Sequence, residues 1–264
     1  MNARCLLLGL VLFAAGFGSA APESRAAGVT VAAAANLTFA LDPLREAFHR
    51  EHPEIEVTLS LGATGNLVAQ IRRGAPFDVL LAADLDYPRA LIASGHAAAD
   101  TLQAFARGRL VWWSLQAPPP GADLATALDD PTLRRIAIAQ PAHAPYGVAA
   151  REVLQHLGRW DDLQPKVVMG ENISQTAQFV ETGNVDGGFV ALSLVLAPRL
   201  KDRGGWIAIP PEFYTPLDQG AVITRRGADN PAAHLFLTWL QGPAAQAVLQ
   251  QFGYAPPTAA PAAP

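Results

Sequence analysis

The stretch from residue 28 to residue 36, GVTVAAAAN, decides the fold, because it carries the chain from a buried strand through a small-residue turn toward a helix. Residues 29–31 (Val-Thr-Val) form a β-branched, apolar run that is typical of a buried strand. Beyond Asn36, the apolar residues of the segment 37–49 recur at helical spacing. A strand that turns directly into a helix is the unit from which α/β folds are built.

The same arrangement of strand, small-residue turn and helix start recurs along the chain. The further turns are Gly62-Ala63-Thr64-Gly65, His143-Ala144-Pro145-Tyr146-Gly147 and Gly170-Glu171-Asn172-Ile173-Ser174. A helix N-terminus offers unpaired backbone N–H groups and the positive end of the helix dipole, so it attracts anions. None of these turns contains lysine or arginine. The pattern therefore predicts a small anion held by dipoles rather than by charged side chains.

Each turn also has a purely structural interpretation. Asn36 and the Thr64-Gly65 pair are ordinary helix starts, the Tyr146 ring can pack into the core, and Ile173 can act as a hydrophobic staple beside a cap. The functional alternative uses the Asn36 amide, the Thr64 and Tyr146 hydroxyls and the main-chain N–H of Ile173 as donors. Both interpretations stay open for any single turn. Together the turns favour the anion site, since ligands bind at the carboxyl ends of strands in open α/β sheets.

The remaining pattern predicts strands that alternate with helices. Such alternation implies an α/β architecture with mainly parallel sheets. We expect a rigid loop or a lobe boundary at the proline run 118–120. The expected strands are 28–34, 56–61, 78–83, 110–113, 135–139, 167–169, 187–192 and 219–224, and the expected helices are 37–49, 66–73, 123–128, one ending at 157, 174–181 and 231–250.

Composition limits the class of partner. The chain has 264 residues, 50% of them apolar, and a net charge of −4. This length supports a substantial core and two lobes. A mildly acidic chain with scattered charge argues against nucleic acid or an anionic membrane as partner, but not against a small anion.

Residues 1–27 have the pattern of a secretory signal peptide. Arg4 supplies the positive region, residues 6–17 the apolar region and residues 18–20 a small-residue cleavage site. The apolar run is shorter than the ~20 residues that a membrane span needs. Cys5, the only cysteine, lies within the signal, so the mature chain is expected to have no disulfide, no thiol nucleophile and no thiolate metal site. These features indicate an exported protein of a bacterial periplasm.

Motifs of enzymes are absent from the sequence. There is no nucleophile elbow, Walker loop, dinucleotide-binding glycine motif or zinc-protease motif. Asp84 and Asp86 could pair as acid and base, and His143 lies near the Tyr146 turn, but no nucleophile and base form a coherent set. The sequence therefore predicts a binding protein rather than an enzyme, and a secreted hydrolase is the disfavoured alternative.

The turns and their flanking residues resemble the periplasmic molybdate-binding proteins of ABC importers. The matching stretches are 32–38 (AAAANLT), 62–67 (GATGNL) with Gln70-Ile71, 74–79 (GAPFDV), 144–147 (APYG), 171–175 (ENISQ) and 188–190 (GFV). Their order and spacing agree over nearly the whole mature chain. Some members carry a tyrosine ligand where this chain has Ala191, and the Tyr146 hydroxyl is the expected substitute.

The resemblance implies a type II periplasmic-binding-protein fold, in which a two-stranded hinge joins two lobes around an oxyanion. The expected ligands are Asn36, Thr64, Tyr146 and Ile173, with Ala35 as a further contact. The expected division is a signal peptide at 1–27, a first lobe at 28–112 plus 218–256, a second lobe at 113–217 and a disordered tail at 257–264.

The resemblance also implies what the protein binds and meets. The ligand is molybdate, with tungstate as a second oxyanion, and molybdenum enters only as the oxyanion, without direct protein ligands. No cofactor is implied. We expect a monomer that delivers its ligand to the membrane permease of an ABC importer. The alternative is a binding protein for another oxyanion or a small organic anion.

Overall fold

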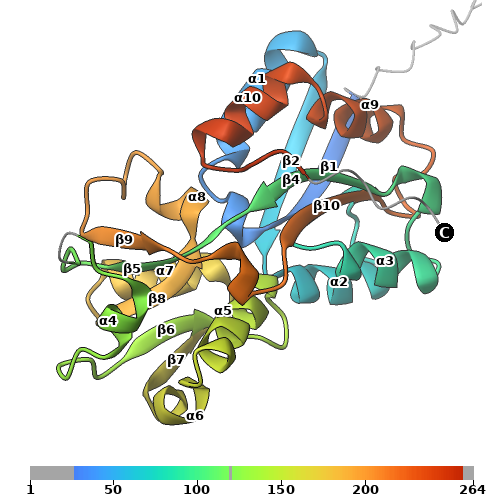
Figure 1. Ribbon diagram of the computed structural model, residues 1–264. Coiled ribbons are helices and arrows are strands. Elements are labelled where there is room, and N and C mark those ends of the chain that lie inside the picture. The colour runs from blue at the N-terminus through green and yellow to red at the C-terminus, as the bar shows by residue number, and fades with distance from the viewer. Residues whose placement is uncertain (1–26, 119–120, 258–264) are drawn as a thin grey trace, which may run out of the picture.

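Two five-stranded sheets form the framework of the protein (Figure 1). The computed structural model describes residues 27–118 and 121–257. The expected signal peptide, apart from Ala27, and residues 258–264 of the expected tail lie outside the described residues. No helix in the described ranges is long and apolar enough to cross a membrane.

The first sheet has the strand order β2-β1-β3-β10-β4. Strand β1 runs parallel to β2 and β3, whereas β10 runs antiparallel to β3 and β4. The strands are β1 (Ala27–Ala34), β2 (Ile55–Gly62), β3 (Val79–Ala82), β4 (Gln103–Gly108) and β10 (Leu217–Ile223).

The second sheet repeats this arrangement with the order β7-β6-β8-β5-β9. Strand β6 runs parallel to β7 and β8, and β5 runs antiparallel to β8 and β9. The strands are β5 (Leu110–Ser114), β6 (Ile136–Ala139), β7 (Val167–Gly170), β8 (Gly187–Ala191) and β9 (Gly205–Ala208).

Both sheets are therefore mixed, and the expectation of mainly parallel sheets is wrong. A parallel neighbour requires a long crossover connection, usually through a helix. Strands β4 and β5, and likewise β9 and β10, instead join one sheet directly to the other, so β5 and β10 enter their sheets antiparallel to the neighbours there. Two type II lobes with mixed sheets result.

The chain crosses between the sheets at two places, at Arg109 and in the segment 209–216. The boundary expected between residues 112 and 113 falls inside β5, because Leu110 to Trp113 pair with β8 of the second sheet. The crossing thus lies at Arg109, at the end of β4 and directly before the apolar run 110–113.

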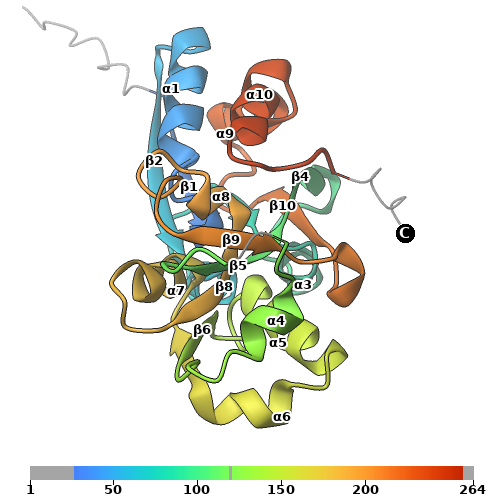
Figure 2. The ribbon, with the colours of Figure 1, turned by 60° about the vertical axis from the view of Figure 1, so that its left-hand side comes forward.

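Helices cover both faces of the first sheet (Figure 1). Helices α1, α9 and α10 share one apolar core with it, and α2 and α3 share another. Figure 2 shows that α1, α9 and α10 gather at the opposite end of the molecule from α6. These helices are α1 (Leu41–Glu51), α2 (Thr64–Arg72), α3 (Asp86–Ala93), α9 (Pro231–Leu240) and α10 (Pro243–Gln251).

The second sheet has its own apolar core, which extends to small residues of the first lobe at the cleft. Its helices are α4 (Leu124–Leu128), α5 (Pro145–His156), α6 (Trp160–Leu163), α7 (Ile173–Glu181) and α8 (Leu192–Val195). Short 3-10 turns complete the structure: η1 (Ala35–Leu37), η2 (Ala99–Thr101), η3 (Gln164–Lys166) and η4 (Pro211–Phe213).

Several elements differ from the sequence prediction. The helix expected over 231–250 is two helices, because the chain turns at Gly242 before Pro243 starts α10. The helix expected at 37–49 begins only at Leu41, after the 3-10 turn η1. Five elements lie outside the predicted set: β4, β9, α3 and the four-residue helices α6 and α8, none of which has a clear apolar period in its sequence. The turn η1 holds Asn36, one of the expected ligand residues.

Candidate functional site

The turns after β1, β2, β6 and β7 converge on one small cavity between the lobes, about 10 Å³ in volume. The parallel strands of each sheet bring these ends to the same edge, and the two edges face each other. Apart from Ala83, every lining residue belongs to one of these turns. The lining residues are Ala34, Ala35, Asn36, Gly62, Ala63, Thr64, Ala83, Ala144, Pro145, Tyr146, Asn172 and Ile173.

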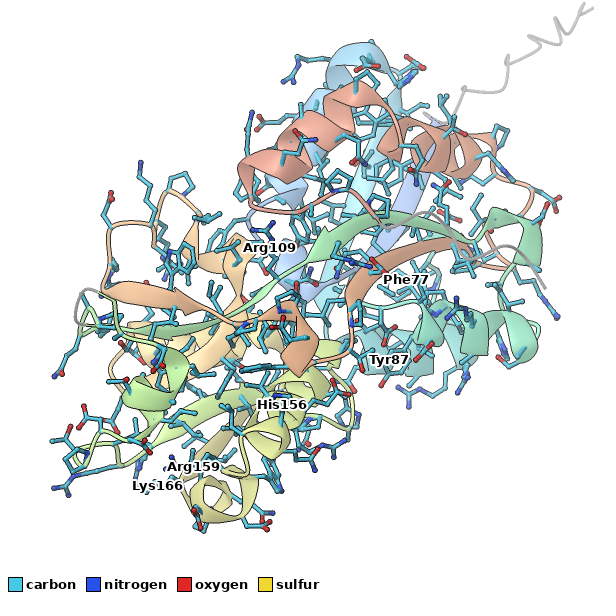
Figure 3. All side chains as sticks on the ribbon, in the orientation of Figure 1. Phe77, Tyr87, Arg109, His156, Arg159 and Lys166 are labelled. Carbon is cyan, nitrogen blue, oxygen red and sulfur yellow. The ribbon has the colours of Figure 1, made fainter. Side chains whose placement is uncertain are left out.

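Hydrogen bonds between the lobes surround this cavity. The N–H of Gly65 donates to the carbonyl of His143 at 2.8 Å. The Tyr87 hydroxyl donates to the carbonyl of Ala142 at 3.3 Å, from a position on α3 that faces the second lobe (Figure 3). Asn66 donates to Glu171 at 3.3 Å. The structure is therefore the closed form of the cleft.

Thr64 presents a hydroxyl donor from the first lobe. Its side chain is only 1% exposed, and its Oγ1 accepts a hydrogen bond from the N–H of Ala83 at 3.2 Å. This bond uses a lone pair of Oγ1 and leaves the hydroxyl hydrogen free to donate. Thr64 is also the first residue of α2, so its main-chain N–H belongs to the unpaired first turn.

The second lobe contributes two helix N-termini. On α7, Asn172 Oδ1 accepts from the N–H groups of Ser174 and Gln175, which leaves Ile173 as the donor that the cap does not use. On α5, Pro145 has no N–H. The N–H groups of Gly147 and Val148 both donate to the carbonyl of Ala144. The remaining donor of that first turn is the N–H of Tyr146.

Asn36 is held differently from the sequence prediction. Its Nδ2 donates to Gln219 Oε1 at 2.8 Å and to the Tyr254 hydroxyl at 2.7 Å. Both hydrogens of the amide are thus committed inside the protein. The side-chain amide of Asn36 is therefore not the free donor that the sequence suggested. Its main-chain N–H is the donor that remains available to a ligand.

The Tyr146 hydroxyl is buried and makes no hydrogen bond of normal geometry to any residue that the structure describes. Burial raises the pKa of Tyr146 well above its ordinary value, the neighbouring Tyr254 and Tyr214 add to this rise, and the nearby Asn36 amide opposes it. The hydroxyl therefore stays a neutral O–H donor. A Cβ atom at Gly108 would overlap this hydroxyl, so only glycine fits at the end of β4.

Among the described residues that line the cavity, Tyr146 alone has an ionisable group, and its hydroxyl is neutral. The donors of the cavity are main-chain N–H groups and hydroxyls from both lobes. In a small buried space, such donors suit an acceptor-rich anion, because hydrogen bonds to a charged partner are stronger than those between neutral groups.

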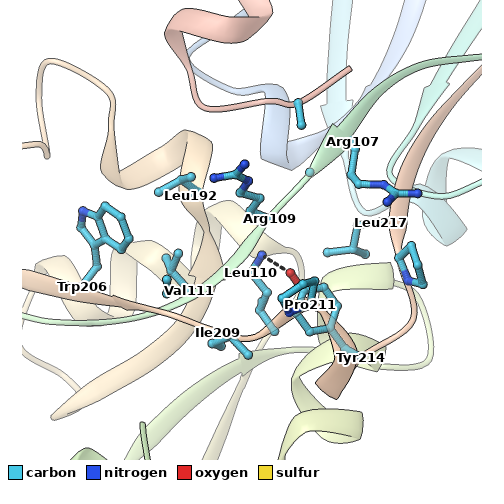
Figure 4. Close-up of a pocket in the computed structure, with 14 residues that line it drawn as sticks. Arg107, Arg109, Leu110, Val111, Leu192, Trp206, Ile209, Pro211, Tyr214 and Leu217 are labelled. Carbon is cyan, nitrogen blue, oxygen red and sulfur yellow. Dashed lines mark hydrogen bonds between the residues drawn. The ribbon is translucent and has the colours of Figure 1, made fainter. Parts of the chain in front are cut away.

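A larger pocket of about 420 Å³ lies at the crossing between the lobes (Figure 4). Arg107 on its wall pairs with Asp218 through contacts of 2.7 and 2.8 Å. The other lining residues include Arg109, Trp206 and Tyr214, and none of the converging turns contributes to it. Its mostly apolar wall distinguishes it from the cavity between the helix N-termini.

Asp84 and Asp86 do not form an acid–base pair. Asp84 Oδ1 accepts from the N–H of Tyr87 at 3.1 Å, and Asp86 contacts Arg89 at 3.3 Å. Within the described ranges, no cluster of three or more histidine, cysteine, aspartate or glutamate residues could hold a metal ion. His143 contributes its main-chain carbonyl to the closed cleft rather than its ring.

Two mixed α/β lobes around a closed cavity define a two-lobed solute-binding protein of the periplasmic type. The family described as bacterial extracellular solute-binding protein matches residues 29–255, and the chain belongs to this family. Membership confirms the prediction of an exported binding protein rather than an enzyme.

Relatives within the family match nearly the full length of the chain. The molybdate-binding protein ModA of Azotobacter vinelandii is 40% identical over 248 residues, which covers 94% of this chain and 97% of the relative. The protein of the same name from Rhodobacter capsulatus is 39% identical over 255 residues, covering 96% and 94%.

Solved structures agree with the fold. The periplasmic molybdate-binding protein of Azotobacter vinelandii matches with a TM-score of 0.82 and 34% identity, covering 87% of this chain and 100% of that one. The sulfate-binding protein SubI of Mycobacterium tuberculosis H37Rv, with a TM-score of 0.72 and 16% identity, covers 87% of this chain and 86% of its own, and supports the fold alone.

Sequence reasoning missed three residues around the site: Ala83, Gln219 and Tyr254. Ala83 lines the cavity, and the other two hold Asn36. Gln219 had a sequence signal, since it is a polar residue directly before the apolar end of the strand LDQGAVI. The structure buries it fully. Tyr254 had no such signal, because it follows the last helix in a short apolar segment.

The pKa of Asp84 predicts a pH-dependent stability. Burial, with a smaller contribution from Asp86, raises this pKa from 3.8 to about 6, although the N–H of Tyr87 opposes the shift. The folded state then holds the proton more tightly than the unfolded state, so stability falls as pH rises from about 4 to about 6. Asp84→Asn should be more stable than wild type by about 1–2 kcal/mol at pH 8 and equal to it near pH 4.

Urea unfolding at both pH values measures this difference. Asn accepts from the Tyr87 N–H as Asp does, so the helix start is kept. Asp86→Asn, at an exposed side chain, is the matched control and should change stability by less than about 0.5 kcal/mol. An Asp84→Asn effect that is independent of pH would contradict the explanation.

Proposed function

We propose that this chain captures molybdate, and also tungstate, in the periplasm and delivers it to the membrane permease of an ABC importer. The observation that carries the proposal is a buried cavity between two lobes, lined by helix N-termini and neutral donors only. The names of relatives about 40% identical over nearly the whole chain support molybdate as the ligand. Molybdate is a dianion at neutral pH whose four oxygens all accept hydrogen bonds, so it matches a wall of donors.

We propose Asn36, Thr64, Tyr146 and Ile173 as the ligand contacts, with Ala35 as a further one. Asn36 and Ile173 would donate through their main-chain N–H groups, and Thr64 through its hydroxyl. The Tyr146 hydroxyl is buried without a partner of normal geometry in the described structure, which is the state expected of a donor that awaits an acceptor. The first-lobe and second-lobe contacts together would make the anion bridge the cleft.

Simple energetics support tight binding by such a site. A hydrogen bond to a charged group contributes ~1.5–3 kcal/mol, and each helix dipole ~0.3–2 kcal/mol. Several such contacts exceed the cost of association and lobe closure. Because the anion touches both lobes, it stabilises the closed form over the open one. The permease would then recognise the closed, loaded form.

We place the lobes at residues 27–108 plus 217–256 and at residues 110–208, joined by the two crossings. The binding unit is a monomer, since one chain supplies every proposed contact. A binding protein for another oxyanion is the competing function, and the ligand titration below separates the two.

Titration calorimetry on protein stripped of ligand tests the proposed function. Molybdate and tungstate should bind with micromolar or tighter affinity, while sulfate and phosphate bind at least ten times more weakly. If sulfate or phosphate produces binding heat and molybdate and tungstate produce none, the result favours the competing function. No heat from molybdate or tungstate would refute the proposal.

Two substitutions test the proposed contacts. Asn36→Asp should abolish molybdate binding, because it places a carboxylate beside the dianion and removes the donor to Gln219. Tyr146→Phe should weaken binding roughly tenfold or more by removing one hydrogen bond to a charged partner. Calorimetry measures both, with circular dichroism to verify folding.

Asn184→Asp is the matched control for the charge change, since the Asn184 side chain is exposed and donates to the Thr182 hydroxyl, away from the cavity. It should leave the molybdate affinity unchanged. If Asn36→Asp binds as tightly as wild type, the site assignment is wrong.

A further inference from the structure

We infer that Gln219 is a positioning residue that orients the two donor groups of the first lobe, at Asn36 and at Thr64. The inference rests on the proposed function and extends it to a residue that does not line the cavity. Gln219 lies on β10, at the point where the pairing register with β4 shifts between Gln219 and Gly220. Its side chain is fully buried.

The orientation of the Gln219 amide is fixed by its neighbours. Nε2 donates to the carbonyl of Ala83 at 3.1 Å and to the carbonyl of Leu217 at 2.8 Å. A carbonyl oxygen can only accept, so both hydrogens of Nε2 must point to these groups. The amide oxygen Oε1 is therefore turned toward Asn36.

This orientation sets that of Asn36. Because Gln219 Oε1 only accepts, Asn36 must present its Nδ2 to it, at 2.8 Å. The Tyr254 hydroxyl takes the second hydrogen of Nδ2 and donates to the Asn36 carbonyl at 3.0 Å, where Ser193 Oγ also donates at 2.7 Å. The peptide after Asn36 is thereby fixed, and the η1 turn with it.

A second chain of hydrogen bonds connects Gln219 to Thr64 through Ala83. The Ala83 carbonyl accepts from Gln219, and the Ala83 N–H donates to Thr64 Oγ1 at 3.2 Å. The bond from Ala83 occupies a lone pair of the Thr64 hydroxyl, which leaves its hydrogen for an acceptor in the cavity. One buried amide thus supports both donor groups of the first lobe.

A buried amide is costly unless its hydrogen bonds are made. Gln219 makes three, and each leads toward the cavity or the crossing strand rather than into the apolar core. This connection to the donors explains why a fully buried polar side chain occupies this position of β10.

Calorimetric titration of molybdate into Gln219→Met tests the inference. Methionine has a similar length but no amide, so Asn36 and Ala83 lose their fixed partner. The affinity should fall roughly 10- to 100-fold. Gln246→Met is the matched control, because Gln246 Nε2 also donates to two carbonyls of the first lobe, those of Phe105 and Leu240, away from the cavity. It should change the affinity less than twofold.

A double-mutant cycle separates positioning from general damage. If Gln219 acts through Thr64, Gln219→Met should lower the molybdate affinity by a clearly smaller factor in a Thr64→Val background than in wild type. General damage to the fold would lower the molybdate affinity by the same factor in both backgrounds.

Gln219→Glu supplies a second test, which also serves if the methionine variant does not fold. Burial should raise the pKa of the new carboxyl, and the protonated form restores a donor to Ala83 or Leu217. Its molybdate affinity should therefore rise more steeply than that of wild type as pH is lowered from 8 to 6. In wild type, Asp84, next to the cavity residue Ala83, is the group whose pKa of about 6 falls in this range.

Additive effects in the cycle, or an affinity of Gln219→Met within twofold of wild type, would overturn the inference while leaving the proposed function intact. If Gln219→Glu is the only variant that folds, a pH profile parallel to that of wild type overturns it. If wild type itself does not bind molybdate, the proposed function and this inference both fail.

Discussion

The unpaired N–H groups of helix first turns are the constraint on which the rest of the structure depends. A helix N-terminus cannot satisfy these donors within itself, and here the first turns of η1, α2, α5 and α7 meet at one cavity. Caps use some of the donors, as Asn172 does on α7. The donors that remain define a surface suited to an anion, without any fixed positive charge.

The two-lobed architecture follows from the same requirement. Each lobe supplies only part of the donor set, so neither sheet forms the site alone. The direct crossings from β4 to β5 and from β9 to β10 make each sheet mixed and allow the lobes to face each other. Closing the cleft brings Gly65 to His143 and Tyr87 to Ala142. Binding and closure are therefore one event for a ligand that contacts both lobes.

The sequence predicts the local part of this structure and misses the distant part. The strand-to-helix turns can be recognised in the sequence because each consists of a few consecutive residues, such as 62–65. The antiparallel course of β5 and β10 depends on where the chain crosses between sheets, which no local pattern records. The state of the Asn36 amide depends on Gln219, 183 residues away, and on Tyr254, 218 residues away. The spacing of residues along the sequence does not predict such distant contacts.

A crystal structure of the molybdate complex, with the metal located by its anomalous scattering, tests the central claim most directly. We expect a single molybdenum peak in the cavity between the lobes. Its oxygens should lie within hydrogen-bond distance of N–H and O–H groups from both lobes, and of no lysine or arginine. A peak beside Arg107 and Arg109 in the crossing pocket, or oxygens paired with a cationic side chain, would contradict it.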